Sequence, residues 1–214
     1  MAKKNHRTKA KRREDRRRAA ASVIEPGVHT LRLIDEDIRP WAELAETYRN
    51  VYLSGMIEDD MAARQQQILH WLDLKDNRPI RIWINSVGGD LFAGIQLYDT
   101  IRGLRSETET IVLGLGASMA GILLQAGTRR LIGPTSQLML HELRAGTSEA
   151  TTSKAKDDAR LLADLEKKFL DILTSRSKLK RKELQAMWER KDAWFDAESA
   201  VKHRLADAIY TGGK

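Results

Sequence analysis

The chain has 214 residues, of which 37 are Lys or Arg and 30 are Asp or Glu, giving a formal net charge of +7. Residues 1–18 hold ten of the basic side chains and only Glu14 and Asp15 as acids. Residues 19–214 are therefore close to neutral, which excludes a domain that is basic on every face. The absence of cysteine excludes disulfides, thiolate catalysis and Cys-based zinc sites.

Residues 1–40 are predicted to form a basic N-terminal arm and linker. Like charges and few apolar side chains favour disorder in the arm, and Pro26, Gly27 and Pro40 interrupt any long element after it. Residues 41–214 are long enough for one domain with a core of its own. No uncharged run suits a membrane span and the N-terminus has no apolar signal region, so we expect a cytoplasmic protein without a membrane partner.

From residue 41 on, short apolar strands alternate with amphipathic helices. We predict strands at 51–53 (ending at Gly55), 80–84, 108–115, 130–132 and 137–141, and helices at about 59–75, 90–104, 118–126, 152–176, 182–190 and 197–202. Residues 142–150 have the composition of a Gly/Thr/Ser loop. This alternation predicts an α/β domain with mostly parallel strands and right-handed crossovers.

Paired glycines, Gly88 and Gly89, lie between a predicted strand and a predicted helix in the segment INSVGGD. Glycines at such a junction allow backbone N–H groups to point at a ligand, close to a helix N-terminus. Two glycines also suit a simple tight turn, so the spacing alone leaves both interpretations open.

A serine surrounded by small residues, Ser118, lies where a buried strand meets a helix in the segment GLGASMAG. The pattern is similar to the nucleophile elbow G-x-S-x-G, with Ala120 at the last glycine position. Such a turn presents the serine Oγ and leaves room for a substrate and for a backbone oxyanion donor. Helix capping by the serine is the ordinary alternative, and the two roles are compatible.

A histidine, His141, ends the apolar strand in the segment LMLHE. Ligand sites in α/β folds lie at the ends of strands, so this histidine is a candidate functional residue. A half-buried structural histidine remains the alternative.

Six segments in order resemble the proteolytic subunit of the Clp protease, over about residues 41–210. They are LSGMIED (53–59), INSVGG (84–89), GIQLYDTI (94–101), GASMA (116–120), LMLH (138–141) and DAWFDAESAV (192–201). The resemblance implies the ClpP/crotonase-like fold, an α/β spiral of ββα units with a long protruding handle helix, here the predicted helix 152–176.

The resemblance also implies a serine endopeptidase with Ser118, His141 and Asp192 as its triad and the backbone N–H groups of Gly89 and Met119 as its oxyanion hole. Without the resemblance, Asp192 would be interpreted as an ordinary exposed acidic residue. The expected reaction is cleavage of peptides or unfolded polypeptides through an acyl-enzyme. No metal or other cofactor is expected, since ATP would be used only by a separate unfoldase.

Expected partners follow from the same resemblance: a homo-oligomer of heptameric rings that encloses a chamber, and an ATPase unfoldase. One alternative is a crotonase-type acyl-CoA enzyme, which shares the fold but does not need the three triad residues together. Another is a non-enzymatic paralogue whose residues 1–18 bind nucleic acid through its phosphates. A solubilising arm or a removable propeptide explains the same basic charge.

Overall fold

The computed structural model describes residues 45–143 and 151–212. The chain divides into two units, residues 1–43 and 44–214, and every described element belongs to the second. The basic arm predicted for residues 1–40 lies outside the described residues, as does most of the loop predicted at 142–150.

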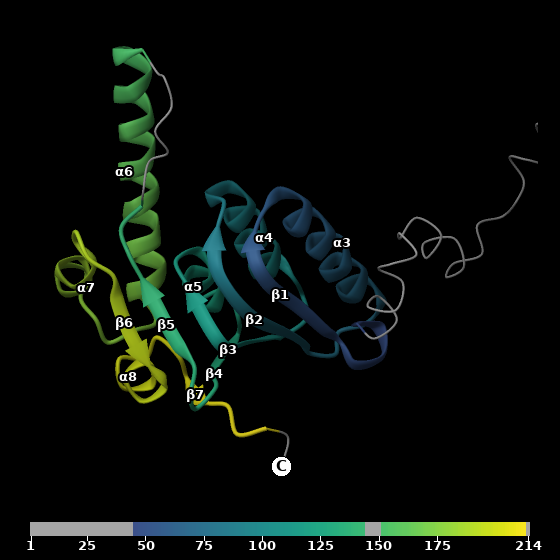
Figure 1. The fold of residues 1–214 in the computed structure, drawn as a ribbon. Coiled ribbons are helices and arrows are strands. Elements are labelled where there is room, and N and C mark those ends of the chain that lie inside the picture. The colour runs from purple at the N-terminus through teal and green to yellow at the C-terminus, as the bar shows by residue number, and fades with distance from the viewer. Residues whose placement is uncertain (1–44, 144–150, 213–214) are drawn as a thin grey trace, which may run out of the picture. The chain divides into compact units, whose positions relative to one another are not determined.

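Seven strands form one sheet (Figure 1). They are β1 (Asn50–Ile57), β2 (Ile80–Gly89), β3 (Thr108–Ala117), β4 (Arg129–Ile132), β5 (Gln137–Leu140), β6 (Ala193–Asp196) and β7 (Ala208–Ile209). The order β1-β2-β3-β4-β7 is parallel throughout, β5 adds a further parallel pairing to β3, and β6 is antiparallel to β5. The predicted α/β architecture with mostly parallel strands is confirmed.

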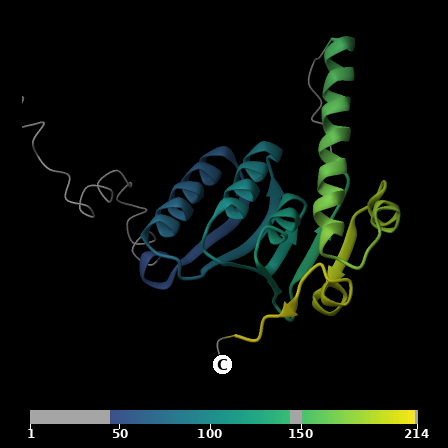
Figure 2. The ribbon, with the colours of Figure 1, turned by 180° about the vertical axis from the view of Figure 1, so that it is seen from behind.

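Helices cover one face of this sheet and extend beyond it. They are α3 (Asp59–Lys75), α4 (Leu91–Gly103), α5 (Met119–Leu124), α6 (Thr152–Ser175), α7 (Arg181–Trp188) and α8 (Ala197–Lys202). Figure 2 shows α3, α4 and α5 on the same face of the sheet. Alternate residues of β2 point into the core beneath them, where Ile80, Ile82 and Ile84 are buried.

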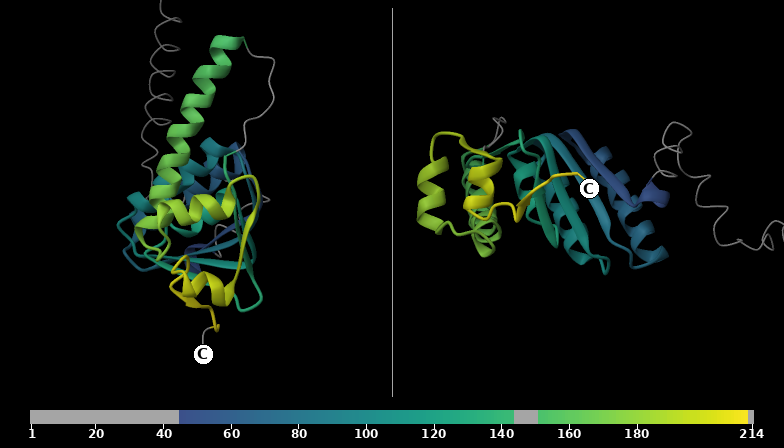
Figure 3. Two further views of the ribbon diagram at one scale, coloured as in Figure 1. Left: turned by 90° about the vertical axis from the view of Figure 1, so that its left-hand side faces the viewer. Right: turned by 90° about the horizontal axis from the view of Figure 1, so that it is seen from below.

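The long helix α6 projects away from the sheet, as Figure 1 and the left view of Figure 3 show. Residues 152–161 are almost all exposed, whereas Leu165, Phe169 and Leu173 in the C-terminal half are buried. The predicted apolar stripe therefore packs only at the base of the helix. The protruding handle helix expected from the resemblance is present.

Strand β3 has two neighbours in succession along one of its edges. Residues 109–112 pair with β4, and residues 115–117 pair with β5. The carboxyl ends of β2, β3 and β5 therefore lie close together, which is where ligand sites form in parallel sheets. These three strands end at Gly89, Ala117 and Leu140.

Two strand predictions are wrong in extent. The first strand does not end at Gly55 but runs on to Ile57, because a register shift between Gly55 and Met56 keeps it paired with β2. β2 itself continues through the paired glycines to Gly89 instead of yielding to a loop. The sequence pattern also gives no indication of β6, a four-residue strand that exists through its pairing with β5.

Candidate active site

A pocket of about 150 Å³ lies at the carboxyl ends of β2, β3 and β5. It is lined by Gly89, Leu91, Ser118, Met119, Ile122, Leu140, His141, Leu143, Leu162, Phe169 and Trp188. Apart from the indole N–H of Trp188, the polar side-chain groups in this lining are those of Ser118 and His141. The structure thus brings together four of the five site residues predicted from the sequence, in an otherwise apolar pocket.

Ser118 sits in a strained turn between β3 and α5. Its backbone has φ 55° and ψ −122°, a region that residues other than glycine rarely adopt. Its N–H donates to the carbonyl of Met139 in β5 at 2.8 Å. Ser118 is the N-cap residue of α5, but its side chain makes no capping hydrogen bond, so capping does not explain why a serine is here. The turn has the form expected of a nucleophile elbow.

Both paired glycines are required by close approach of the backbone. A Cβ atom at Gly88, whose φ is +92°, would lie 2.7 Å from the Ser118 Cβ and 3.0 Å from the Met119 nitrogen. A Cβ atom at Gly89, whose φ is +152°, would collide with the backbone of Ile57 in β1. The simple-turn interpretation is therefore insufficient. Gly88, one of the two candidate glycines, does not line the pocket but lies directly against Ser118.

His141 follows β5 and is half-buried. Its Nδ1 lies 2.5 Å from the backbone carbonyl of Glu142. Because a carbonyl oxygen only accepts, Nδ1 carries the hydrogen in this arrangement and Nε2 keeps its lone pair. The imidazole is thus held in the tautomer that can accept a proton at Nε2.

Asp192 is exposed and immediately precedes β6. The antiparallel ladder between β5 and β6 ends at the pair Leu140–Ala193, and His141 and Asp192 are the next residues beyond it on the two segments. Asp192 is not part of the pocket lining.

The Clp protease family model matches residues 37–213. The chain belongs to the Clp protease family. It is similar to the "ATP-dependent Clp protease proteolytic subunit" of Streptococcus mutans, with 34% identity over 165 residues that make up 75% of this chain and 84% of the relative. The same-named protein of Carsonella ruddii is 32% identical over 163 residues, 75% and 83% of the two chains. "ATP-dependent Clp protease proteolytic subunit 2" of Prochlorococcus marinus is 31% identical over 189 residues, 87% and 92% of the two chains.

Membership of the Clp protease family makes this chain a serine-type endopeptidase with the ClpP-like fold. The crotonase-type and non-enzymatic alternatives are not favoured by these relatives. Within residues 45–143 and 151–212, no group of three His, Asp or Glu side chains is arranged to hold a metal ion. No helix in the same ranges combines the length and apolarity needed to cross a membrane.

Proposed function

We propose that Ser118 is the nucleophile of this Clp-type serine endopeptidase and that His141 is its general base. His141 Nε2 takes the Ser118 hydroxyl proton, Oγ attacks the scissile carbonyl, and the protonated imidazole then donates to the leaving amine. Water repeats the sequence to release the acyl group. The observation that carries this proposal is the pocket shared by a serine in a strained elbow and a histidine whose Nε2 is free to accept.

Asp192 completes the proposed triad. It orients His141 by accepting from Nδ1–H and stabilises the imidazolium that forms during attack. The proposal is supported by the end of the β5–β6 ladder at Leu140–Ala193, after which His141 and Asp192 are the next residues on the two segments. In this mechanism Asp192 replaces the Glu142 carbonyl as the partner of Nδ1.

The backbone N–H groups of Gly89 and Met119 form the proposed oxyanion hole. Both residues line the pocket that holds Ser118, and Met119 directly follows the nucleophile. Donors of this kind stabilise the negative charge that develops on the substrate oxygen, and each contributes about 10²–10³ in kcat.

The proposed substrates are peptides and unfolded polypeptides that reach the site inside an oligomeric chamber. The exposed half of α6 supplies a surface for contacts between subunits, and heptameric rings are the proposed assembly. The relatives are named as subunits of an ATP-dependent protease. We therefore assign ATP use to a separate unfoldase and no cofactor to this chain.

A fluorophosphonate probe tests the proposed nucleophile directly. Wild-type protein is expected to gain one covalent adduct per chain, located at Ser118 by peptide mass mapping. Ser118→Ala is expected to abolish both the adduct and peptide cleavage. Ser153→Ala, which removes an exposed hydroxyl from α6, is the matched control and should change neither. An adduct at another serine, or none on folded protein, would overturn the proposal.

A further inference from the structure

The helix that follows the nucleophile is short and is anchored at its two ends. α5 has six residues, all buried and none with a hydrogen-bonding side chain, with Ser118 before it and Gln125 after it. At 1.5 Å per residue it is only about 9 Å long. Because so short a helix moves as a rigid piece, a shift at Gln125 is carried to Ser118.

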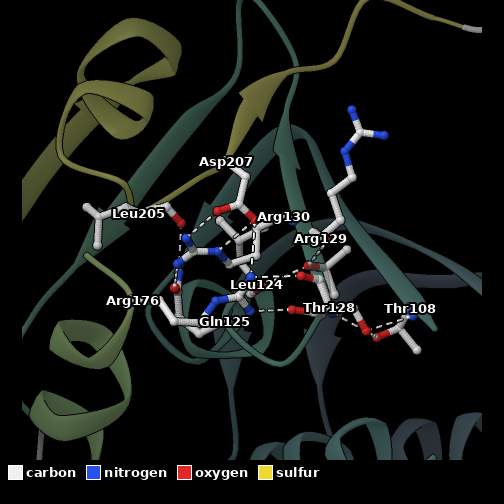
Figure 4. Close-up of polar contacts among 11 residues, drawn as sticks. Thr108, Leu124, Gln125, Thr128, Arg129, Arg130, Arg176, Leu205 and Asp207 are labelled. Atoms are coloured by element: carbon white, nitrogen blue, oxygen red, sulfur yellow. Dashed lines mark hydrogen bonds and ion pairs between the residues drawn. The ribbon is translucent and has the colours of Figure 1, made fainter. Parts of the chain in front are cut away.

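Gln125 fixes the C-terminal end of α5 through three hydrogen bonds in the interior. Its Nε2 donates to the carbonyls of Leu205 at 3.1 Å and Gly121 at 3.4 Å. Its Oε1 accepts from Nη1 of Arg130 at 2.6 Å (Figure 4). Gln125 is 3% exposed, so losing these bonds would leave buried polar groups unpaired.

Arg130 is in turn fixed by Asp207. Arg130 is 1% exposed, and its Nε and Nη2 donate to the two carboxylate oxygens of Asp207 at 3.2 and 2.5 Å. Arg176, at the end of α6, donates to the same carboxylate at 3.2 Å. Burial raises the pKa of Asp207, but its hydrogen bonds and charge pairing with Arg130 outweigh burial and lower it. The carboxylate thus stays ionised and the arginine fork stays fixed at neutral pH.

The anchoring of α5 matters most at its N-terminal end, where Ser118 has a strained backbone. A strained backbone such as that of Ser118 persists only where the surrounding structure determines it from several sides. The hydrogen bond from the Ser118 N–H to Met139 is one constraint, and the anchored end of α5 is another.

We propose that Gln125, held by Arg130, is a positioning residue for peptide cleavage. It fixes the C-terminal end of α5 so that the Ser118 hydroxyl and the Met119 N–H keep the geometry of attack. This inference rests on the proposed roles of Ser118 and Met119. Gln125 lies outside the pocket lining, so its effect on the reaction passes through α5.

Gln125→Met tests the inference because it keeps the side-chain length and removes all three hydrogen bonds. We expect kcat for a fluorogenic peptide, and the rate of fluorophosphonate labelling, to fall about tenfold, since a displacement of about 1 Å can cost up to about 10²-fold. KM should change less than kcat, because most of the pocket lining lies outside α5. Gln125→Glu keeps the acceptor for Arg130 and should recover part of the rate.

Arg176→Met is the matched control, because it removes three hydrogen bonds, to Asp207 and to the carbonyls of Gly127 and Thr128, none of which involves a residue of α5 or Gln125. It should lower the melting temperature and leave kcat within about twofold. A folded Gln125→Met protein with wild-type kcat and labelling rate would overturn the inference. If that variant does not fold, Arg130→Lys decides, because it keeps a cation beside Asp207 and removes the Nη1 donor to Gln125. A wild-type rate in folded Arg130→Lys would overturn the inference as well. Wild-type protein that takes no probe at Ser118 would overturn the proposed function and this inference with it.

Discussion

Leu140 in β5 is paired with Ala193 in β6, and this antiparallel pair directly precedes His141 on one segment and directly follows Asp192 on the other. The loop, α6 and α7 separate Leu140 from Ala193 along the chain. A slip of one residue would turn every side chain of β6 to the other face of the sheet. The proposed triad role of Asp192 therefore depends on the register between β5 and β6.

Asp192→Asn measures whether the carboxylate is part of the catalytic machinery. If Asp192 accepts from Nδ1 during attack, kcat should fall by about 10³–10⁴, because the asparagine amide favours the wrong tautomer. Asp196→Asn is the matched control, since it removes a charge from the same strand and asparagine can still cap α8. A loss below tenfold for Asp192→Asn would mean that the Glu142 carbonyl orients His141 instead.

Gly88→Ala tests the close approach of the glycine segment to Ser118. The added Cβ would lie 2.7 Å from the Ser118 Cβ and 3.0 Å from the Met119 nitrogen, at a φ of +92°. We expect probe labelling to fall by about 10²-fold or more while the fold survives, at a cost of about 1–3 kcal/mol in the free energy of unfolding. Circular dichroism and labelling kinetics measure the two effects separately.

Gly89→Ala should behave differently, because its Cβ meets the backbone of Ile57 and not the pocket. Its first effect should be loss of β1–β2 pairing, seen as a lower melting temperature than that of Gly88→Ala. Gly103→Ala, where no atom lies within 4 Å of an added Cβ, should match wild type in both measurements. Equal labelling rates in Gly88→Ala and wild type would contradict the predicted crowding at Ser118.

Trp188 limits the size of the pocket beside the proposed nucleophile. It is 3% exposed and is the last residue of α7. Trp188→Leu should raise kcat/KM for a peptide with tryptophan before the scissile bond, relative to one with leucine, by about tenfold. Trp188→Leu should lower the free energy of unfolding by less than the about 3–5 kcal/mol expected for Trp188→Ala. Trp194→Leu, at an exposed position outside the pocket, should leave the ratio unchanged. An unchanged ratio in Trp188→Leu would contradict this role.

Asp73 makes the stability of the domain depend on pH in acid. Burial raises the pKa of Asp73, but hydrogen bonds from Ser106 and Arg105 outweigh burial and lower it from 3.8 to about 2. The stabilisation is therefore complete above the unfolded pKa and is lost as the pH falls from about 4 to about 2. Asp73→Asn should cost about 1–3 kcal/mol at neutral pH and flatten this part of the acid titration.

Urea unfolding between pH 2 and 7 measures this dependence. Asp99→Asn, at an exposed position of α4, should retain the wild-type slope between pH 4 and 2. An Asp73→Asn titration that runs parallel to wild type would show that Asp73 does not cause the acid sensitivity.

The strands and helices that the sequence predicts well have strong periodic patterns. Ile80, Ile82 and Ile84 alternate, and the stripe of α6 repeats at helical spacing, so residue pattern alone predicts both elements. β6 is only four residues long and has no alternating pattern from which a strand could be predicted. Its ladder pairing is with β5. The extension of β1 past Gly55 likewise depends on a register shift against β2.

The sequence by itself determined the α/β alternation, the two glycines, and Ser118 and His141 as candidates, because each lies within one continuous segment where strand meets helix or loop. Only the tertiary structure decided that β3 pairs first with β4 and then with β5, which puts Ser118 and His141 at one pocket. The tertiary structure also decided that Gln125, Arg130 and Asp207 form one hydrogen-bonded network at the C-terminal end of α5. Contacts between residues far apart in the chain depend on strand register and packing, and neither is encoded in any one segment.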